Sequence, residues 1–276
     1  NLPTINSTSE VFTPSFIFDR TISLPVIPPD SSVFTPSITA SVSYISPFLY
    51  MDFETSSSTV VDGNQGTYSS LTGTLVGGAG DFPPRYNNTS PYSGTYSLEF
   101  YDGSNSNTAT NALNFGTPNE NSQWSFISGS FTFAFWYYPY ALSQYGSLIN
   151  HKVLESSSGY EWMIVTGDNT GSDGPIGFYD IGGGTWNFYP AQNATGALHP
   201  NQWNHIVVTV SGTVAADDRR FRAYINGTDL GEYTSRDFPN NYNADRQIFF
   251  GQWYWTTSIY MLNGKIDEVS VWDFDV

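Results

Sequence analysis

Hydrophobic and polar side chains alternate along much of the chain with the period of two that is typical of β-strands. The clearest example is Phe131–Tyr137, where three phenylalanines fall on one side of the segment. Trp203–Gly212 contains a β-branched run, and residues 221–225 alternate again before Asn226 and Gly227. An Asn-Gly dipeptide tolerates the positive φ angles of a tight hairpin turn. The pattern therefore predicts antiparallel sheet, with a hairpin turn at Asn226-Gly227.

Similar segments extend the predicted sheet over residues 48–276. They are Leu49–Glu54, Tyr96–Phe100, Ser147–Ile149, Glu161–Val165, Gly177–Ile181, Gln247–Gly251 and Lys265–Trp272. About ten strands or more, with no convincing helix, predict an all-β fold built as a two-sheet antiparallel sandwich or jelly roll.

Composition agrees with this fold class and narrows the possible partners. Aromatic residues make up 17% of the 276 residues and charged residues 12%, with 25 Gly and 16 Pro, as in a β-protein with many turns. A formal net charge of -16 disfavours nucleic acid and anionic membrane surfaces as partners. The absence of cysteine excludes disulfides and thiolate metal sites. No run approaches the roughly 18 apolar residues that a membrane span needs, so we expect no membrane insertion.

Residues 1–47 differ from the rest because they contain a repeat. The pentapeptide that starts at Val11 recurs, identical, from Val33, which is 22 residues later. Its apolar and proline positions are Val11, Phe12, Pro14, Val33, Phe34 and Pro36. So short a repeat with prolines cannot form its own core, so we expect an extended arm that lies on the main domain, on sister chains or on a larger assembly. A disordered Pro/Ser linker is the alternative, and the apolar content argues against it.

Four segments in order resemble the laminin-G-like, concanavalin A-like jelly-roll family. They are Phe131–Pro139 (FTFAFWYYP), Trp203–Gly212 (WNHIVVTVSG), Tyr224–Gly231 (YINGTDLG) and Leu262–Trp272 (LNGKIDEVSVW). The resemblance covers about residues 48–276 and implies a two-sheet concanavalin A-like sandwich. It also implies that some relatives hydrolyse glycans and that members often carry one calcium ion.

The repeat arm resembles the proline-containing stalk repeats that precede such domains in bacteriophage structural proteins. Together the two resemblances imply a non-enzymatic virion surface protein: a capsid decoration protein, a head fibre or a tail adhesin. The arm would anchor it to other virion proteins or to sister chains, and the sandwich would be displayed outward, with a host-surface glycan as a possible ligand. The alternative is a secreted, extracellular carbohydrate-binding module or adhesin.

The carboxylates give little support to a glycoside hydrolase, which is the less favoured alternative. That chemistry needs two carboxyl groups that face each other roughly 5–9 Å apart. Asp267 and Glu268 are neighbours in a predicted strand, so we expect them on opposite faces. Asp52 and Glu54 share a face, but we expect their strand at an edge. No Gly-x-Ser-x-Gly elbow is present, and His205 fits a packed strand histidine, so we predict no enzyme activity.

Calcium has two candidate sites. The loop 167–174 concentrates oxygen donors in Asp168, Asn169 and Asp173. Asp267 is the second candidate, because strict alternation places it on the same face as Val269 and Val271, where an inward carboxylate would need a partner. For both sites the alternative is an Asp that forms a turn by bonding its own backbone.

Clusters of aromatic residues near predicted strand ends are the candidate ligand site. They include Trp253, Tyr254 and Trp255, then Trp186 and Tyr189, and finally Tyr137–Tyr140. Sugar rings stack on aromatic planes, so these residues could bind a glycan. The alternative is that they fill the core or an interface between chains, as Tyr and Trp often do, and an interface is the favoured interpretation.

Overall fold

The computed structural model describes residues 46–55, 57, 59–61, 71–77, 83–100, 111–120, 122–141, 146–152, 160–166, 176–182, 185–190, 198–212, 220–234, 244–251, 253–255, 258–260 and 262–274. Residues 46–276 form one compact unit. Both copies of the repeat fall outside the described residues, so the extended arm stays a prediction.

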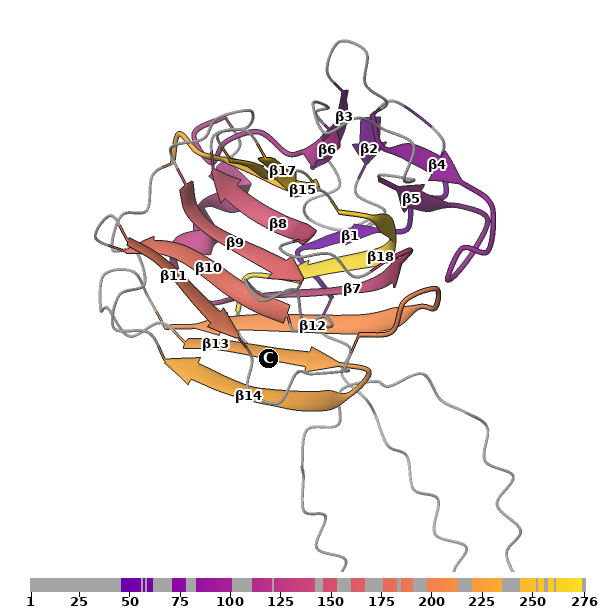
Figure 1. Cartoon of the computed structure of the whole chain (residues 1–276). Coiled ribbons are helices and arrows are strands. Elements are labelled where there is room, and N and C mark those ends of the chain that lie inside the picture. The colour runs from indigo at the N-terminus through magenta and orange to yellow at the C-terminus, as the bar shows by residue number, and fades with distance from the viewer. Residues whose placement is uncertain are drawn as a thin grey trace, which may run out of the picture. The chain divides into compact units, whose positions relative to one another are not determined.

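Two antiparallel sheets of eight strands each make up the domain (Figure 1). In the first, which we call the front sheet, the order is β14 (Thr228–Thr234), β13 (Arg220–Ile225), β12 (Asn204–Ser211), β7 (Phe131–Pro139), β18 (Gly264–Trp272), β5 (Ser97–Glu99) and β4 (Arg85–Asn87), and β1 (Leu49–Met51) pairs with β18.

The second, or back, sheet has the order β11 (Thr185–Pro190), β10 (Ile176–Gly182), β9 (Tyr160–Thr166), β8 (Gly146–Lys152), β15 (Gln247–Gly251), β6 (Asn111–Asn114), β3 (Thr72–Gly77) and β2 (Thr59–Val61). A separate hairpin pairs β16 (Trp253–Trp255) with β17 (Ser258–Tyr260). The helical structure in the described part of the chain is one 3-10 helix, Ser122–Ser128. The predicted all-β sandwich is confirmed.

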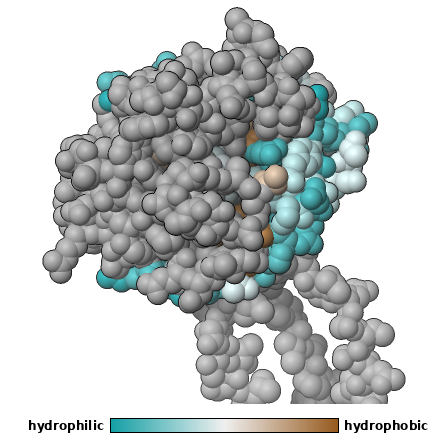
Figure 2. All heavy atoms as spheres, in the orientation of Figure 1, coloured by the Kyte–Doolittle hydropathy of each residue, from teal (hydrophilic) through white to brown (hydrophobic). Residues whose placement is uncertain are grey.

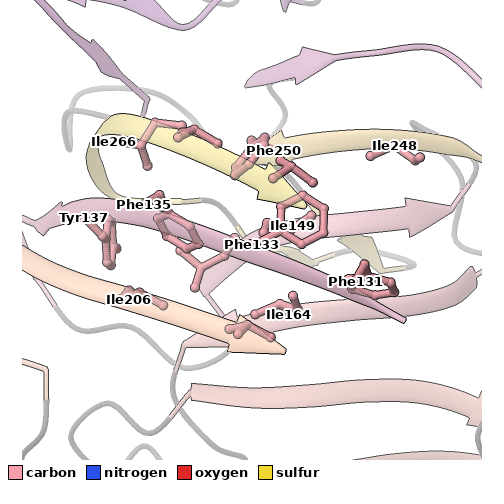
Figure 3. Close-up of a cluster of buried hydrophobic side chains, with 14 of the residues drawn as sticks. Phe131, Phe133, Phe135, Tyr137, Ile149, Ile164, Ile206, Ile248, Phe250 and Ile266 are labelled. Carbon is pink, nitrogen blue, oxygen red and sulfur yellow. The ribbon is translucent and has the colours of Figure 1, made fainter. Parts of the chain in front are cut away.

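The core lies between the two sheets, and strand β7 shows why. Its alternate residues Phe131, Phe133, Phe135 and Tyr137 are at most 2% exposed. Figure 3 shows these side chains pointing toward aliphatic and aromatic residues of the back sheet. Phe250 receives Phe133 and Phe135 edge-on, with ring centroids 6.3 and 6.0 Å apart. The period-two pattern therefore separates a buried face of the front sheet from an outer face that carries the intervening residues.

The Asn-Gly turn forms as predicted. Asn226 and Gly227 have φ angles of 51° and 78°, and they join β13 to β14 through the pair Ile225–Thr228. Two successive positive φ angles match the right-handed twist of a hairpin, which explains why this dipeptide closes it.

Strand β18 contains a bulge at its centre. Asp267 pairs with Trp136 and Ser270 with Ala134, so two residues of β18 lie opposite Phe135 alone. The bulge coincides with a change of neighbour, because Lys265 and Ile266 pair with β5 whereas residues 269–271 pair with β1.

Glu268 occupies the bulge with a φ of 52°, which is uncommon for a residue other than glycine. The sequence prediction that Asp267 shares a face with Val269 and Val271 was wrong, because the extra residue breaks the alternation. Val269 and Val271 point into the core, while Asp267 lies on the outer face with Trp136.

The outer face also receives Glu268. Its carboxylate accepts a hydrogen bond from the Tyr50 hydroxyl, and Tyr50 lies opposite Ser270, between the core residues Leu49 and Met51. Asp267 and Glu268 therefore lie on one side of the sheet, and the expectation of opposite faces was wrong for the same reason. Among the described residues no helix is long and apolar enough to cross a membrane.

Candidate functional site

The candidate site is a group of aromatic and charged side chains on the outer face of the front sheet. Strand β7 contributes Trp136 and Tyr138, which alternate with the core phenylalanines. His205 of β12 lies opposite Trp136, with ring centroids 4.9 Å apart. Strand β18 adds Lys265 opposite Tyr138 and Asp267 opposite Trp136. Antiparallel pairing thus gathers, on one surface, residues that are far apart in sequence.

Residues 88–96, which we call the β4–β5 loop, lie over this surface. Tyr92 in the loop stacks on Trp136 at a centroid distance of 3.7 Å and an interplanar angle of 14°. Trp203, just before β12, meets Tyr92 edge-on at 6.1 Å and Tyr138 at 5.4 Å. Aromatic pairs in these arrangements contribute about 0.5–1.5 kcal/mol each beyond their buried area. The rings therefore hold the middle of the loop against the sheet.

The backbone amides of the loop are bound by two carboxylates. Asp267 Oδ2 accepts hydrogen bonds from the amides of Tyr92 at 2.9 Å and Ser93 at 3.2 Å. Glu54 accepts from the amide of Thr95 with both oxygens, at 2.9 and 2.8 Å. Asp267 is 0% exposed, so these amides are the groups that compensate its burial.

The carbonyls at the other end of the loop are bound by a cation. Lys265 Nζ donates to the Thr89 carbonyl at 2.6 Å and to the Ser90 carbonyl at 3.4 Å. The indole N–H of Trp203 donates to the same Ser90 carbonyl at 3.2 Å. The ammonium group also lies 4.6 Å from the ring centre of Tyr138 and 5.6 Å from that of Trp203, within cation–π range. Lys265 is 3% exposed, so its ammonium group interacts with the loop and hardly with solvent.

Two loop residues have positive φ angles, which fix the shape of the loop. Ser90 has a φ of 53° and Gly94 one of 59°. A Cβ atom at Gly94 would collide with the Glu54 carboxylate that holds the amide of Thr95. Glycine is therefore favoured there by its backbone conformation, and a larger residue would also displace the Glu54 carboxylate from the amide of Thr95.

Burial shifts the pKa values of several groups on this face. Burial raises the pKa of Asp267 to about 7, and the nearby Glu268 carboxylate adds to the shift, while hydrogen bonds from the amides of Ser93, Glu268 and Tyr92 oppose it. Burial also lowers the pKa of His205 and of Lys265. Each shift favours the neutral form, as expected for a charge that is removed from water.

Glu99 at the edge of the site behaves differently. Burial alone would raise its pKa, but hydrogen bonds from Tyr140, Asn87 and Arg85 outweigh it and lower the pKa. The contact with Arg85 is 2.7 Å from Nε to Oε2, and the Tyr140 hydroxyl donates to the other oxygen. Glu99 is therefore a paired anion.

The predicted site residues are only partly placed. Trp186 and Tyr189 lie in β11, and Trp253, Tyr254 and Trp255 form β16, but their side chains fall outside the described residues. Asp168, Asn169 and Asp173 of the predicted calcium loop, and the arm residues, fall outside them altogether. Asp267 is the one predicted metal ligand that the structure describes, and backbone amides occupy its oxygens. Within the described ranges, no group of three or more His, Asp or Glu side chains could hold a metal ion.

Sequence reasoning missed the main residues of this face. Tyr138 and Tyr140 were in a predicted aromatic cluster, but Trp136, Trp203 and Lys265 were read only as parts of strand motifs. Their signal was available, because Trp136 and Tyr138 alternate with the core phenylalanines and must face away from them.

Comparison with known families agrees with this architecture. Residues 110–275 match a family model described as the concanavalin A-like lectin/glucanases superfamily. This match spans more than half of the chain, so the protein belongs to that superfamily, and the predicted family is confirmed. A search of curated proteins found no match.

Solved structures share the fold at low sequence identity. A Trypanosoma rangeli sialidase in complex with sialic acid has 13% identity and a TM-score of 0.53, over 89% of this chain and 34% of that chain. The binding domain of botulinum neurotoxin DC in complex with SialylT has 13% identity and a TM-score of 0.50, over 84% of this chain and 48% of that one. The protein thus spans about a third of the sialidase and about half of the toxin chain. At this identity the likeness concerns the fold alone.

Proposed function

We propose that this protein is a non-enzymatic, carbohydrate-binding virion protein of a bacteriophage, with the sandwich displayed outward and residues 1–47 as its anchor. The observation that carries the binding function is the outer face of the front sheet. There Trp203 and Tyr138, both partly exposed, lie beside a loop whose exposed residues bear hydroxyl and amide groups. Aromatic planes and polar side chains side by side are what a sugar ring requires, and membership of a superfamily that includes lectins supports the proposal.

The environment of Asp267 favours binding over hydrolysis. Although Asp267 and Glu268 lie on one face, Asp267 is fully buried and bonded to loop amides, so it cannot reach a glycosidic oxygen without loss of the loop. A general acid must contact the atom that it protonates. Incubation with a panel of oligosaccharides should therefore release no reducing sugar. Release that Glu268→Gln abolishes would establish a glycoside hydrolase instead.

A glycan array with the full chain tests the binding function. We expect binding that Trp203→Ala removes and that Trp203→Phe largely keeps, because Phe retains a ring that can stack but loses the hydrogen bond to Ser90. Trp255→Ala tests the site predicted from the sequence, in β16. If Trp255→Ala abolishes glycan binding and Trp203→Ala does not, the proposed function stands and the binding site lies at β16. A blank array would contradict glycan binding and leave decoration of the particle as the role.

The anchoring role rests on the repeat in residues 1–47, which has apolar positions but cannot form a core of its own. Deletion of residues 1–45 should abolish association with the particle and leave the thermal melt of the remaining domain nearly unchanged. Retained association would contradict the anchor. A wild-type chain that is secreted and never found on particles would identify a free carbohydrate-binding module.

A further inference from the structure

We infer that the glycan bound at the outer face of the front sheet is electrically neutral, and that sialylated or uronic-acid-containing glycans are rejected there. This inference rests on the proposed carbohydrate binding and specifies its ligand class. The inference follows from the charged side chains near Trp203 and Tyr138. Each of these side chains already binds another group of the protein.

The first observation concerns cations. Within the strand bounds given above, the front sheet contains four Lys or Arg residues, namely Arg85, Arg220, Arg222 and Lys265. A ligand carboxylate that leaves water is held most strongly by a charged hydrogen-bond donor, above all by the planar fork of an Arg. If such a donor came from this sheet, it would have to be one of these four side chains.

Each of these four cations has another partner. Lys265 donates to two loop carbonyls and is nearly inaccessible. Arg85 pairs with the buried carboxylate of Glu99. Arg220 and Arg222 pair with Glu232 and Asp229 on β14, two strands beyond β12. The β4–β5 loop itself, residues 88–96, contains no Lys or Arg.

The second observation concerns anions. Glu268 and Glu54 lie on the sheet side of the loop, where they accept hydrogen bonds from the hydroxyl of Tyr50 and from the amide of Thr95. Asp267 beside them has a pKa raised to about 7, so it carries only part of a negative charge at neutral pH. The whole chain carries a formal charge of -16. An anionic sugar would approach like charges, and the described front-sheet strands and the β4–β5 loop offer no uncommitted cation to offset the desolvation of the sugar, an arrangement that suppresses binding.

The third observation is what the loop does present. Asn88, Thr89, Ser90, Ser93 and Thr95 are exposed, and the described residues on the face that Figure 2 shows are mostly hydrophilic, with small hydrophobic spots. Hydroxyl and amide groups both donate and accept, so they match the hydroxyls of a neutral sugar. The buried charges hold these groups in one conformation, which reduces the entropy lost on binding.

Matched pairs of glycans test this inference directly. Oligosaccharides that share a core, with and without a terminal sialic acid, should be titrated into the full chain by calorimetry at about 20 mM and about 150 mM salt. We expect the neutral member to bind about tenfold or more tightly, with the difference narrowing at higher salt. Equal or tighter binding of the sialylated member would overturn the neutral-ligand inference alone. Binding of neither would overturn the proposed function, and the inference with it.

Two charge variants locate the source of the discrimination. Glu268→Gln keeps an acceptor for the Tyr50 hydroxyl but removes the charge. It should therefore lower the ratio of the dissociation constants of the sialylated and the neutral glycan several-fold. Glu232→Gln, on β14 and paired with Arg220, removes the same charge at the far end of the sheet and should leave the ratio unchanged. Equal effects of the two variants would mean that net charge, not this face, sets the preference.

Discussion

The two ends of the outer face of the front sheet hold charged side chains in opposite ways. On β13 and β14, Arg220 pairs with Glu232 at 3.1 Å and Arg222 with Asp229, and all four side chains are 38–55% exposed. Under the β4–β5 loop, Lys265 and Asp267 are 3% and 0% exposed. Their partners are backbone carbonyls and amides rather than each other.

This difference teaches what each set of charges does. Exposed ion pairs contribute about 0–1 kcal/mol, since water screens them and two long side chains lose freedom. A buried charge bonded to the backbone fixes the path of the chain, and its removal leaves polar groups unsatisfied. The β13–β14 ion pairs therefore add little to the stability of their hairpin. Lys265 and Asp267, by contrast, fix the conformation of the loop at the candidate site.

Replacement of Lys265 should give the largest effect. Lys265→Met keeps the apolar stem but removes the donor to the Thr89 and Ser90 carbonyls, so we expect a loss of about 2–3 kcal/mol in the free energy of unfolding by urea denaturation. Arg222→Met is the matched control at the other end and should cost less than about 1 kcal/mol. Equal losses would erase the contrast between the two ends.

The pH dependence of stability should show the next largest effect. The pKa of Asp267 rises from its ordinary value of 3.8 to about 7 on folding, so the folded state binds more protons between these values. Stability should therefore fall as pH rises from about 4 to 7, by at most about 1.4 kcal/mol per pH unit, which is the slope for one proton. Burial of His205 lowers its pKa and acts with the opposite sign below about pH 6.5, so the raw curve combines both.

Asp267→Asn isolates the contribution of the carboxyl group, because the variant keeps His205 and the nearby Glu268. The difference in unfolding free energy between wild type and Asp267→Asn should change with pH across this window, in favour of the variant as pH rises. A difference that stays constant from pH 4 to 7 would contradict a raised pKa at Asp267.

Gly94→Ala should have a smaller effect, of about 1–2 kcal/mol, because an alanine at a φ of 59° is strained. The new Cβ would also collide with the Glu54 carboxylate. Gly227→Ala in the hairpin turn is the control, since its φ of 78° is similarly positive but no atom lies within 4 Å of the added Cβ. Thermal melts should rank Gly94→Ala as the more harmful, and the reverse order would show that Glu54 does not constrain the loop.

Strands and core could be predicted from sequence because they depend on local alternation. Phe131, Phe133 and Phe135 follow period two without interruption, and Asn226-Gly227 specifies its own turn. The bulge could not be predicted in this way, because it occurs where β18 changes its neighbour from β5 to β1, a feature of topology. Strict alternation predicted Asp267 on the core face from local sequence alone. The bulge depends instead on which distant strands pair with β18.

The candidate site escaped prediction for a related reason. Lys265 was visible in a strand motif, but the carbonyls that it binds lie 175 and 176 residues away in sequence. Nothing in the local pattern around Lys265 indicates a loop partner, so its role emerged only from the arrangement of β4, β5 and β18.

The smallest expected effect on the free energy of unfolding concerns the exposed pair Arg222–Asp229. It tests the difference between this exposed pair and the buried Lys265. Arg222 lowers the pKa of Asp229 through their hydrogen bond, and Asp229 also accepts from the amide of Gly231 at 2.9 Å. Asp229→Asn keeps that acceptor, so it should cost less than about 1 kcal/mol at low salt and less still at about 1 M salt, where the screening length is only about 3 Å. The cost of Lys265→Met should change little with salt, since Lys265 is only 3% exposed and its hydrogen-bond partners are uncharged carbonyls. Equal sensitivity to salt at both ends would mean that solvent reaches the ammonium group beneath the β4–β5 loop.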